Sequence, residues 1–521
     1  MNARPEIALA IVQALAARLG PGAVVTDLAE LTIMGNDLFF WDNVVPPACM
    51  VRPTSPDEVV AVVEATRTAG APLFMRGGGM SYTNAYGPQV PGGVLVDLGG
   101  LDKIREVDVV NRYIVVEAGC TWKQIVQALA PHSMAVDFPA PLSGSHSTVG
   151  GALSQNVPGG MQGVLGLEVV LADGSVVHTG AWASRRNAKP FIRNYGPDLT
   201  GMFLGDNGVL GIKTAAALHI KPRARGAAFA SFAFENYADL AQTMIELSPF
   251  DFITRRTGLC PYETQNIAKV GLGDAIKTVA QVIAAEKSKV SGLIEAAKMA
   301  AAGRNFLDGV KWSFHIKSEA VSTAAAEEGI ALARAVCLKR GRELPPILPR
   351  AREAVGFSIR KFLGKDGERW IATSSVWPIA RAVEIADAVE DFVAARRVEL
   401  DRHGIVVSYI TNFSPYYFLC EPCFYWRDEL SPLHLRNLPA DEAERFKSFA
   451  PNPAARAVVK KTREEMRDLF HSLGSIHVQV GDFYRFQSEL KPEALALLKT
   501  VKRALDPERR LNPGKLDGLS G

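Results

Sequence analysis

The sequence predicts an α+β protein in which one mixed half is interrupted by a second, more helical unit. Between residues 47 and 222, short apolar runs with strand periodicity alternate with glycine-rich turns. From residue 226 to about residue 473, long alanine-rich patterns with helical spacing alternate with a few aromatic strands, as in an antiparallel sheet covered by helices. From residue 474 the pattern returns to a strand, a helix and an Asn-Pro-Gly turn, so we expect this tail to complete the first half.

The elements of the first half follow from apolar spacing and from the turn residues between them. Apolar residues recur at helical spacing from Ile7 to Leu19, which predicts a helix within residues 1–20. The four residues Ala172-Asp173-Gly174-Ser175 have the composition of a hairpin turn between strands 165–171 and 176–179. The other elements expected here are strands 49–52, 72–76, 93–98 and 113–117 and helices 56–70 and 122–130.

The middle and the tail are assigned in the same way. We expect helices at 238–247, 272–302, 320–339 and 379–396 and strands at 227–234, 310–315, 405–411 and 416–425. In the tail we expect a strand at 475–486, a helix at 492–505 and a turn at 512–514.

Composition excludes several classes of protein. Lys plus Arg number 58 and Asp plus Glu 55, and no basic run is long enough to follow a nucleic-acid backbone or an anionic bilayer. Nowhere do 18 consecutive apolar residues occur, so we expect no transmembrane segment. Six cysteines are too few for a disulfide scaffold, and no export signal is visible, so we expect a cytoplasmic protein.

Three glycine-containing loops in the first half have the size of phosphate-binding loops. Arg76-Gly77-Gly78-Gly79-Met80-Ser81 leaves a strand and can turn several backbone N–H groups toward one anion, although no Gly-Lys-Ser/Thr follows as in a Walker loop. The second loop, 145–152, offers hydroxyls and a glycine pair, and the third, 205–212, precedes a strand. Three such loops without a Rossmann fingerprint favour one large dinucleotide cofactor in a non-Rossmann domain.

The order of these segments resembles the flavoproteins of the vanillyl-alcohol oxidase and p-cresol methylhydroxylase superfamily. The resemblance covers residues 47–222 and 474–516, and its matching pieces are 53–59, 76–82, 116–122, 147–151, 167–174, 208–213 and 511–515. It implies a two-part FAD-binding domain of the p-cresol methylhydroxylase type, formed by residues 1–225 and 474–521. It also implies that residues 226–473 form a substrate-binding cap with an antiparallel sheet and helices.

The resemblance implies FAD as the cofactor and assigns residues to it. The loop from Arg76 to Tyr82 would lie on the pyrophosphate, the loop from Ser147 to Gly151 beside the phosphates and the isoalloxazine, Ile212 at the adenine, and Lys515 near the flavin. The complete expected set is Arg76, Gly77, Gly78, Gly79, Met80, Ser81, Tyr82, Pro139, Ser147, Thr148, Gly150, Gly151, Gly211, Ile212 and Lys515.

The mode of flavin attachment departs from that of many relatives. They carry a histidine joined covalently to the flavin where this chain has Met80, and a thioether cannot form that link. FAD is therefore expected to be non-covalent, with Tyr416 or Tyr417 of the cap as the alternative attachment point.

The tail segment bears on the substrate. Gly481-x-x-Tyr484-Arg485 resembles the tyrosine–arginine pair with which the 4-alkylphenol-oxidising branch holds its phenol, and Tyr82 stands where that branch has its third phenol ligand. A free phenol has a pKa near 10, and a guanidinium together with two hydroxyl donors would lower it and favour the phenolate from which hydride leaves readily. Arg485, Tyr484 and Tyr82 are therefore the candidate phenolate clamp, and no metal site is expected.

The catalytic base is a separate question, because the acidic residue that phenol oxidases place near flavin N5 has no obvious counterpart here. His477 is the first candidate, since histidine titrates near neutrality and, in an extended tail strand, would share a face with Gln479 and Arg485. Glu421 in an expected cap strand is the second candidate.

The leading expectation is thus an FAD-dependent oxidase or dehydrogenase acting on a 4-hydroxyphenyl or lignin-like aromatic compound. One alternative is a D-2-hydroxy acid dehydrogenase for lactate or glycolate, which the lack of a histidine cluster disfavours. Another is a flavin electron-transfer subunit that docks a cytochrome. The expected partners are a small aromatic substrate, a cytochrome or O2 as electron acceptor, and a second copy in a homodimer.

Two weaker patterns have simpler explanations. Cys420 and Cys423 have redox spacing, but residues three apart in a strand point to opposite faces, so an aromatic core strand is the better interpretation. Arg456, Lys460, Lys461 and Arg463 are expected to form a solvated helix face.

Overall fold

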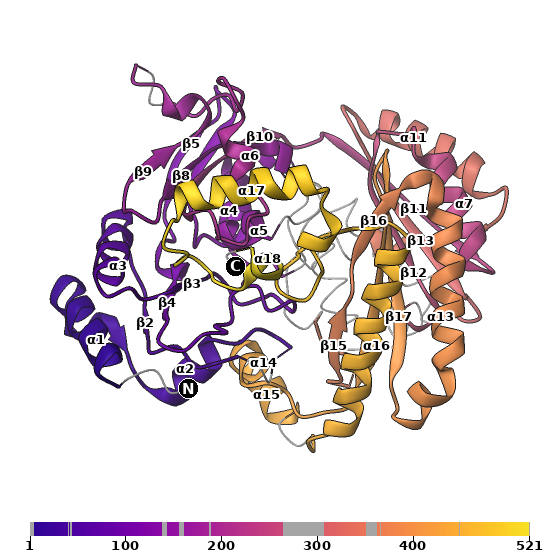
Figure 1. Cartoon of the computed structure of the whole chain (residues 1–521). Coiled ribbons are helices and arrows are strands. Elements are labelled where there is room, and N and C mark those ends of the chain that lie inside the picture. The colour runs from indigo at the N-terminus through magenta and orange to yellow at the C-terminus, as the bar shows by residue number, and fades with distance from the viewer. Residues whose placement is uncertain are drawn as a thin grey trace.

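The computed structural model describes residues 5–39, 41, 44–137, 143–155, 161–186, 189–263, 307–350, 362–364, 366–446 and 449–519. It is a mixed helix and sheet protein, as expected. Figure 1 shows the N-terminal half in indigo and purple beside a large orange sheet, with the yellow C-terminal helices α17 (Pro492–Leu505) and α18 (Lys515–Gly518) lying over the N-terminal half.

A small sheet opens the first half, in the order β1 (Val24–Val25), β2 (Cys49–Val51), β4 (Val94–Asp97) and β3 (Leu73–Arg76). Strands β2, β4 and β3 are parallel, which requires a crossover, and α3 (Pro56–Thr68) supplies it between β2 and β3. Ser55 caps α3, whose apolar stripe of Val59, Val62 and Val63 is buried together with residues of α1 (Pro5–Leu19).

A second, antiparallel sheet has the order β5 (Ile104–Asp108), β6 (Tyr113–Glu117), β10 (Ile212–Pro222), β8 (Val164–Val170) and β9 (Val176–His178), and β7 (Met134–Val136) pairs with β10. Its inner face packs on α4 (Trp122–Leu129) and on the short α5 (Val149–Ser154), and α17 and α18 contribute to the same core. The glycine loops that precede α5 and β10 therefore lie side by side at one edge of this core.

The large sheet of the middle segment has the order β14 (Arg342–Leu344), β11 (Gly226–Phe234), β13 (Trp312–Ala320), β12 (Ile253–Leu259), β17 (Val406–Phe413), β18 (Tyr417–Trp426), β16 (Ser375–Pro378) and β19 (Ile476–His477). A further strand, β15 (Arg369–Ala372), pairs with β18. Helices α7 (Tyr237–Leu247), α11 (Thr323–Cys337) and α13 (Ala382–Arg402) pack against it (Figure 1). Helix α16 (Pro453–Ser472) lies where this sheet meets the N-terminal half.

The expected tail strand 475–486 is wrong. Within it the structure has the two-residue strand β19, which pairs with β16 of the large sheet rather than with either sheet of the first half. The backbone φ of +66° at Gly474, +56° at Gln479 and +56° at Gly481 explains the difference, because left-handed residues cannot continue an extended strand. The predicted domain boundaries at 225/226 and 473/474 stay predictions, and the expected helix 272–302 lies outside the described residues.

Several elements had no counterpart among the expected ones, among them β5, β12, β15 and β16, whereas α16 contains the helix face expected at 456–463. Within the described ranges, no helix is both apolar enough and long enough to reach across a lipid bilayer.

Candidate active site

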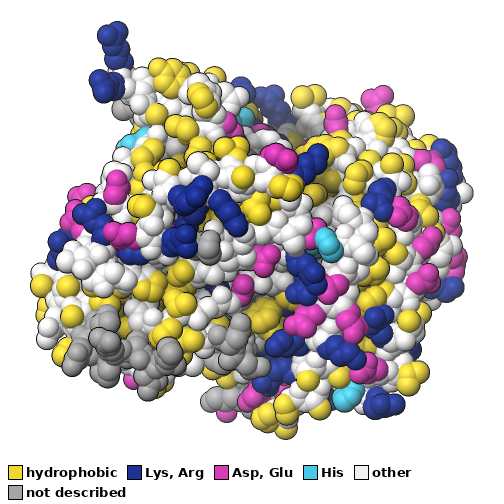
Figure 2. All heavy atoms as spheres, in the orientation of Figure 1, with side chains coloured by type: hydrophobic (Ala, Val, Ile, Leu, Met, Phe, Trp, Pro, Cys, Tyr) yellow, Lys and Arg dark blue, Asp and Glu magenta, His cyan; other side chains and the backbone are white. Residues whose placement is uncertain are grey.

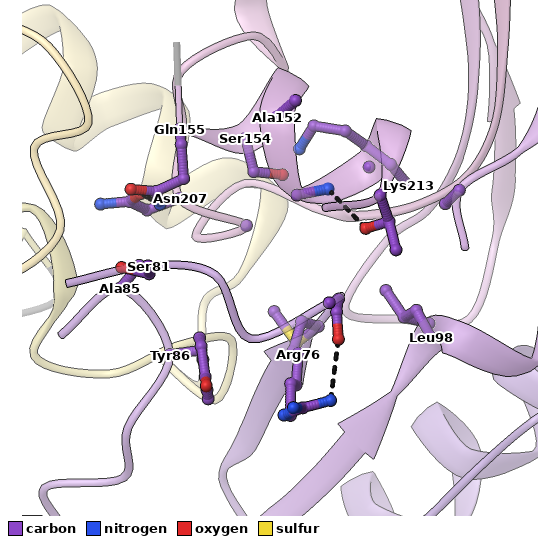
Figure 3. Close-up of a pocket in the computed structure, with 18 of the residues that line it drawn as sticks. Arg76, Ser81, Ala85, Tyr86, Leu98, Ala152, Ser154, Gln155, Asn207 and Lys213 are labelled. Carbon is purple, nitrogen blue, oxygen red and sulfur yellow. Dashed lines mark hydrogen bonds between the residues drawn. The ribbon is translucent and has the colours of Figure 1, made fainter. Parts of the chain in front are cut away.

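The three glycine loops surround one cavity of about 940 Å³, counted together with its open mouth. Figure 3 shows Gln155 and Asn207 on one side of it, Tyr86 and Arg76 on another, and Leu98 and Lys213 beyond. Of the residues expected to hold a cofactor, the structure gathers Arg76, Gly77, Gly78, Gly79, Met80, Ser81, Ser147, Thr148, Gly150, Gly151, Gly211 and Ile212 in the cavity wall.

The first two loops touch through their backbones. A Cβ atom added at Gly78 would overlap the carbonyl oxygen of His146 and would lie 2.7 Å from its carbonyl carbon and 3.2 Å from Cα of Ser147. At Gly77 an added Cβ would collide with the hydroxyl of Thr148, which caps α5. Glycine is therefore required where the loop after β3 passes the loop before α5.

Polar groups that need partners face this cavity. Arg76 is 7% exposed, and its guanidinium donates to the carbonyl of Gly77 at 2.9 Å (Figure 3) and lies 3.6 Å from Asp97. Within the described part of the chain, Nε of Arg76, Oγ of Ser147 and Oε1 of Gln155 are buried without a hydrogen-bond partner. Buried polar atoms are normally satisfied, so these three indicate a polar ligand.

This donor set fits FAD. A buried guanidinium, unpaired hydroxyl and amide groups and a glycine loop that admits close backbone approach suit a pyrophosphate. The apolar side chains of Met75, Leu98 and Ile212 line the same cavity and suit flat rings.

Three expected cofactor residues do not lie in the described wall of the cavity. Pro139 is outside the described residues, and Tyr82 belongs to a neighbouring cluster. Lys515 is fully buried, and its Nζ has no hydrogen-bond partner among the described residues. Burial lowers its pKa to about 8, although the negative charges of Asp482 and Asp37 act to raise it. Lys515 is nevertheless close to the wall, because its backbone N–H donates to the carbonyl of the wall residue Asn512.

Tyr82 and Tyr484 meet beyond the end of the loop that carries Ser81. The Tyr82 hydroxyl donates to Oε1 of Glu421 at 3.4 Å, and Ser374 donates to the same oxygen through its hydroxyl at 2.7 Å. The backbone N–H of Ser374 donates to the Tyr484 hydroxyl at 2.6 Å. Burial raises the pKa of the Tyr82 hydroxyl well above its ordinary value, and the negative charge of Glu421 is the second cause. Burial also raises the pKa of the Tyr484 hydroxyl.

The cation of this cluster is Arg463, which the sequence pattern placed on a solvated helix face. That expectation is wrong, because Arg463 is 1% exposed. Its Nε donates to the carbonyl of Ala372 at 3.0 Å and its Nη2 to the carbonyl of Tyr82 at 2.9 Å. Nη1 is buried and has no partner among the residues described.

Four aromatic rings surround this guanidinium. The Arg463 Cζ atom lies 3.8 Å from the ring centre of Phe483, 5.6 Å from Phe39, 5.7 Å from Trp41 and 5.9 Å from Tyr82. We call these rings the arginine cage. Burial lowers the Arg463 pKa to about 10, so the side chain stays positive at neutral pH, and ring faces partly replace the lost water.

The other predicted arginine, Arg485, is not in this cluster. Its side chain is 45% exposed and pairs with Asp468 on the outside of α16 at 3.0 Å. Tyr484 is buried and the adjacent Arg485 is exposed, and adjacent residues of an extended strand would also point to opposite faces. The structure therefore brings together Tyr82 and Tyr484, but not Arg485.

His477 lies beside the cluster rather than at the cavity. Its ring stacks on Tyr484 at 4.5 Å, and its Nδ1 is 2.8 Å from the hydroxyl of Ser375. Nε2 is buried and has no partner within the described ranges. The two candidate bases therefore each contact a tyrosine of the cluster, His477 through Tyr484 and Glu421 through Tyr82.

Burial of His477 predicts acid sensitivity. Burial first, then the charges of His471 and Arg467, lowers its pKa from the ordinary 6.5 to about 4. Because the folded-state pKa lies below the unfolded-state value, only the unfolded chain takes up the proton, so stability is full above about pH 6.5 and falls as the pH drops toward 4. The expected loss from about pH 7 to about pH 5 is about 2 kcal/mol.

Denaturant unfolding at both pH values measures this loss, with His477→Gln as the comparison. The variant should lose less stability over the same interval, and equal losses in the two proteins would contradict the prediction.

Flavin attachment is expected to be non-covalent. Met80 lines the cavity, whereas Tyr416 is 62% exposed and Tyr417 packs against it, and neither is in the described cavity wall. Acid precipitation of the purified protein should therefore leave the flavin in the supernatant. Yellow colour retained in the pellet would mean that another residue forms a link.

Sequence reasoning missed Arg463 because it counted the charges of 456–463 and not their spacing. The buried residues of α16 include Ala455, Val459, Arg463, Met466 and Phe470, which recur every three or four positions. Arg463 is therefore in the apolar stripe, and the stripe was visible in the sequence.

Comparisons with known proteins agree with this geometry. Residues 47–180 match the family model of the FAD binding domain, and residues 454–516 match that of the C-terminal domain of FAD linked oxidases. An uncharacterized FAD-linked oxidoreductase of Mycobacterium tuberculosis is 33% identical over 187 residues, which is 34% of this chain and 38% of the relative. The glycolate oxidase subunit GlcD of Bacillus subtilis is 28% identical over 251 residues, 45% of this chain and 50% of the relative. The chain thus matches half or less of the length of these curated relatives.

The fold has a solved counterpart over nearly its whole length. The crystal structure of p-cresol methylhydroxylase with substrate bound superposes on this protein with a TM-score of 0.71 at 20% sequence identity. The superposition covers 98% of this chain and 97% of the p-cresol methylhydroxylase chain. Two parts of the chain thus match the FAD binding domain and the C-terminal domain of FAD linked oxidases, and its fold is that of p-cresol methylhydroxylase.

Proposed function

We propose that the protein is an FAD-dependent oxidoreductase that removes hydride from a small anionic substrate, with a 4-hydroxyphenyl compound as the favoured class. One observation carries the proposal. The buried Arg463 has no acidic hydrogen-bond partner and a free Nη1 among the described residues, and the charge of the buried Asp37 acts on it only through space. A buried cation of this kind requires an anion.

A phenolate suits the polar groups around that cation. Opposite charge stabilises the ionised form first and hydrogen bonding second, so Arg463 would lower the pKa of a bound phenol from its usual value near 10. The Tyr484 hydroxyl accepts the N–H of Ser374 and keeps its own proton to donate. In this proposal Arg463, rather than Arg485, is the cation that binds the phenolate, and Tyr82 and Tyr484 remain its hydrogen-bonding partners.

The phenol proton has two candidate acceptors. The Glu421 carboxylate already receives two hydroxyl donors, and a proton placed on it would remove its charge from beside the phenolate. His477 is neutral above about pH 4, and its Nε2 is free to accept among the described residues. FAD, when bound, supplies the hydride acceptor for the oxidation.

A D-2-hydroxy acid is the second candidate, because the glycolate oxidase subunit of Bacillus subtilis shares sequence with this chain and its relatives also include a D-lactate dehydrogenase. The carboxylate of such a substrate would pair with Arg463 as well as a phenolate would.

The experiment that tests the proposal is anaerobic stopped-flow reduction of the purified holoenzyme. The panel contains 4-alkylphenols, 4-hydroxybenzyl alcohols, their 4-methoxy analogues, and D-lactate and glycolate. We expect rapid loss of flavin colour with the phenols and not with the methoxy analogues, which cannot ionise. Reduction by hydroxy acids alone would replace the aromatic substrate with the second candidate. Reoxidation by O2 or by cytochrome c then distinguishes oxidase from dehydrogenase.

A further inference from the structure

A loop on the outer face of the second sheet exposes apolar side chains. It runs from η5 (Gly180–Ala183) to α6 (Leu199–Met202) without regular structure over residues 191–198. Phe191 is 53% exposed, Ile192 46%, Tyr195 62% and Leu199 41%. Single exposed apolar residues are ordinary, but four in nine consecutive positions mark an interaction surface.

The turn between β5 and β6 extends this surface. Val109 is 39% exposed and Val110 is 90% exposed at its tip. The turn is tied to the loop, because Lys189 pairs with Glu106 of β5, and Tyr113 of β6 donates to the same carboxylate at 3.0 Å. We call Val109, Val110, Phe191, Ile192, Tyr195 and Leu199 the loop patch.

The charge around the loop patch is positive. Arg185 and Arg186 are exposed in the turn before the loop, and neither forms an ion pair with any described residue. Of the neighbouring acids, Glu106 forms an ion pair with Lys189 and Asp198 with Arg193, whereas Asp108 accepts a hydrogen bond from the neutral Asn111 and keeps its charge. In Figure 2, Lys and Arg side chains project from the upper left of the molecule beside a band of hydrophobic side chains, where Figure 1 places the β5 and β9 end of this sheet.

We propose that the loop patch seats the enzyme on the anionic surface of a lipid bilayer. Aromatic and aliphatic side chains on a loop tip can enter the boundary between headgroups and acyl chains, and arginines beside them attract anionic headgroups. A second copy fits less well, because a two-fold interface would bring four arginines without described ion-pair partners, Arg185 and Arg186 of each copy, into one interface. No long basic run marks this surface in the sequence, because two separate segments build it.

Flotation of the holoenzyme with vesicles tests the proposal, and its outcome does not depend on which substrate the enzyme oxidises. Vesicles of phosphatidylcholine with phosphatidylglycerol are compared with vesicles of phosphatidylcholine alone. We expect binding to the anionic vesicles that weakens with salt, and about thirty-fold weaker binding for Arg185→Ser/Arg186→Ser. Phe191→Ser/Tyr195→Ser should also lose binding, and that loss should persist at low salt.

The matched control is Val398→Ser/Arg402→Ser, which removes an exposed apolar residue and an exposed arginine from α13 on the other half of the molecule. It should bind as the unmodified protein does. Flavin content and thermal midpoint verify that every variant is folded. Absence of binding to anionic vesicles by the folded holoenzyme would overturn the proposal. So would equal loss in the control, or a concentration-dependent dimer that Phe191→Ser/Tyr195→Ser abolishes.

Discussion

Replacing Arg463 by lysine is expected to lower kcat/KM for flavin reduction by about a hundredfold while the protein keeps its flavin. A hydrogen bond to a charged group contributes about 1.5–3 kcal/mol, and lysine cannot reproduce the planar fork that reaches Ala372, Tyr82 and a substrate anion together. The substitution keeps a positive charge in the arginine cage, so folding should survive it. Stopped-flow reduction gives the rate, and flavin absorbance after gel filtration gives cofactor content.

Arg463→Ala should cost more, because two backbone carbonyls lose their donor and a volume among four rings is left empty. We expect destabilisation of about 3–5 kcal/mol in addition to loss of reduction. Arg485→Ala is the matched control, since its exposed pair with Asp468 should change stability by less than about 1 kcal/mol and leave reduction intact. If Arg485→Ala instead abolished reduction and Arg463→Lys did not, the assignment of the substrate cation to Arg463 would be wrong.

The second large effect is expected from Gly78→Ala, which should abolish FAD binding. The new methyl group would occupy the position of the His146 carbonyl, and backbone atoms cannot swing aside as a side chain can. The loop after β3 would have to separate from the loop before α5, which would open the cavity wall that we expect to hold the pyrophosphate. We expect a cost of several kcal/mol, as for other overpacked sites. The measurements are flavin content on purification and the thermal midpoint with and without added FAD.

Gly22→Ala serves as the comparison, because nothing lies within 4 Å of the position that its new methyl group would take. It should keep both flavin and stability. A Gly78→Ala protein that retains stoichiometric FAD would refute the requirement for backbone contact between the two loops.

Local signals sufficed for much of the fold. Apolar spacing predicted α3, α4, α17 and the strands β6 and β8 to within a residue or two. The three glycine loops were grouped correctly around one cavity because each needs close backbone approach, a property that the residue type itself shows. The residues of the anion site were harder to predict, because their placement depends on long-range contacts.

Two residues show the reason. Tyr484 and Arg485 are neighbours in the sequence, yet Tyr484 is buried and accepts a hydrogen bond from the distant Ser374, while Arg485 is exposed and pairs with Asp468. Arg463 sits among charged neighbours, and what makes it internal is its contact with Phe39, Tyr82 and Phe483 from distant segments. No window of sequence contains these partners, so spacing within α16 was the one available signal.

The tail also sets the order in which this chain can fold. Strand β3 pairs with Leu511 and its Met75 N–H is bonded by Asn512, 437 positions later. At a synthesis rate of about 5–20 residues per second, tens of seconds therefore pass between the synthesis of β3 and that of Asn512, during which the whole middle segment is made. The middle segment can collapse on itself first, whereas the flavin cavity, which Asn512 and Gln479 help to line, closes last. Newly made chains can thus complete this cavity only after Asn512 has emerged from the ribosome.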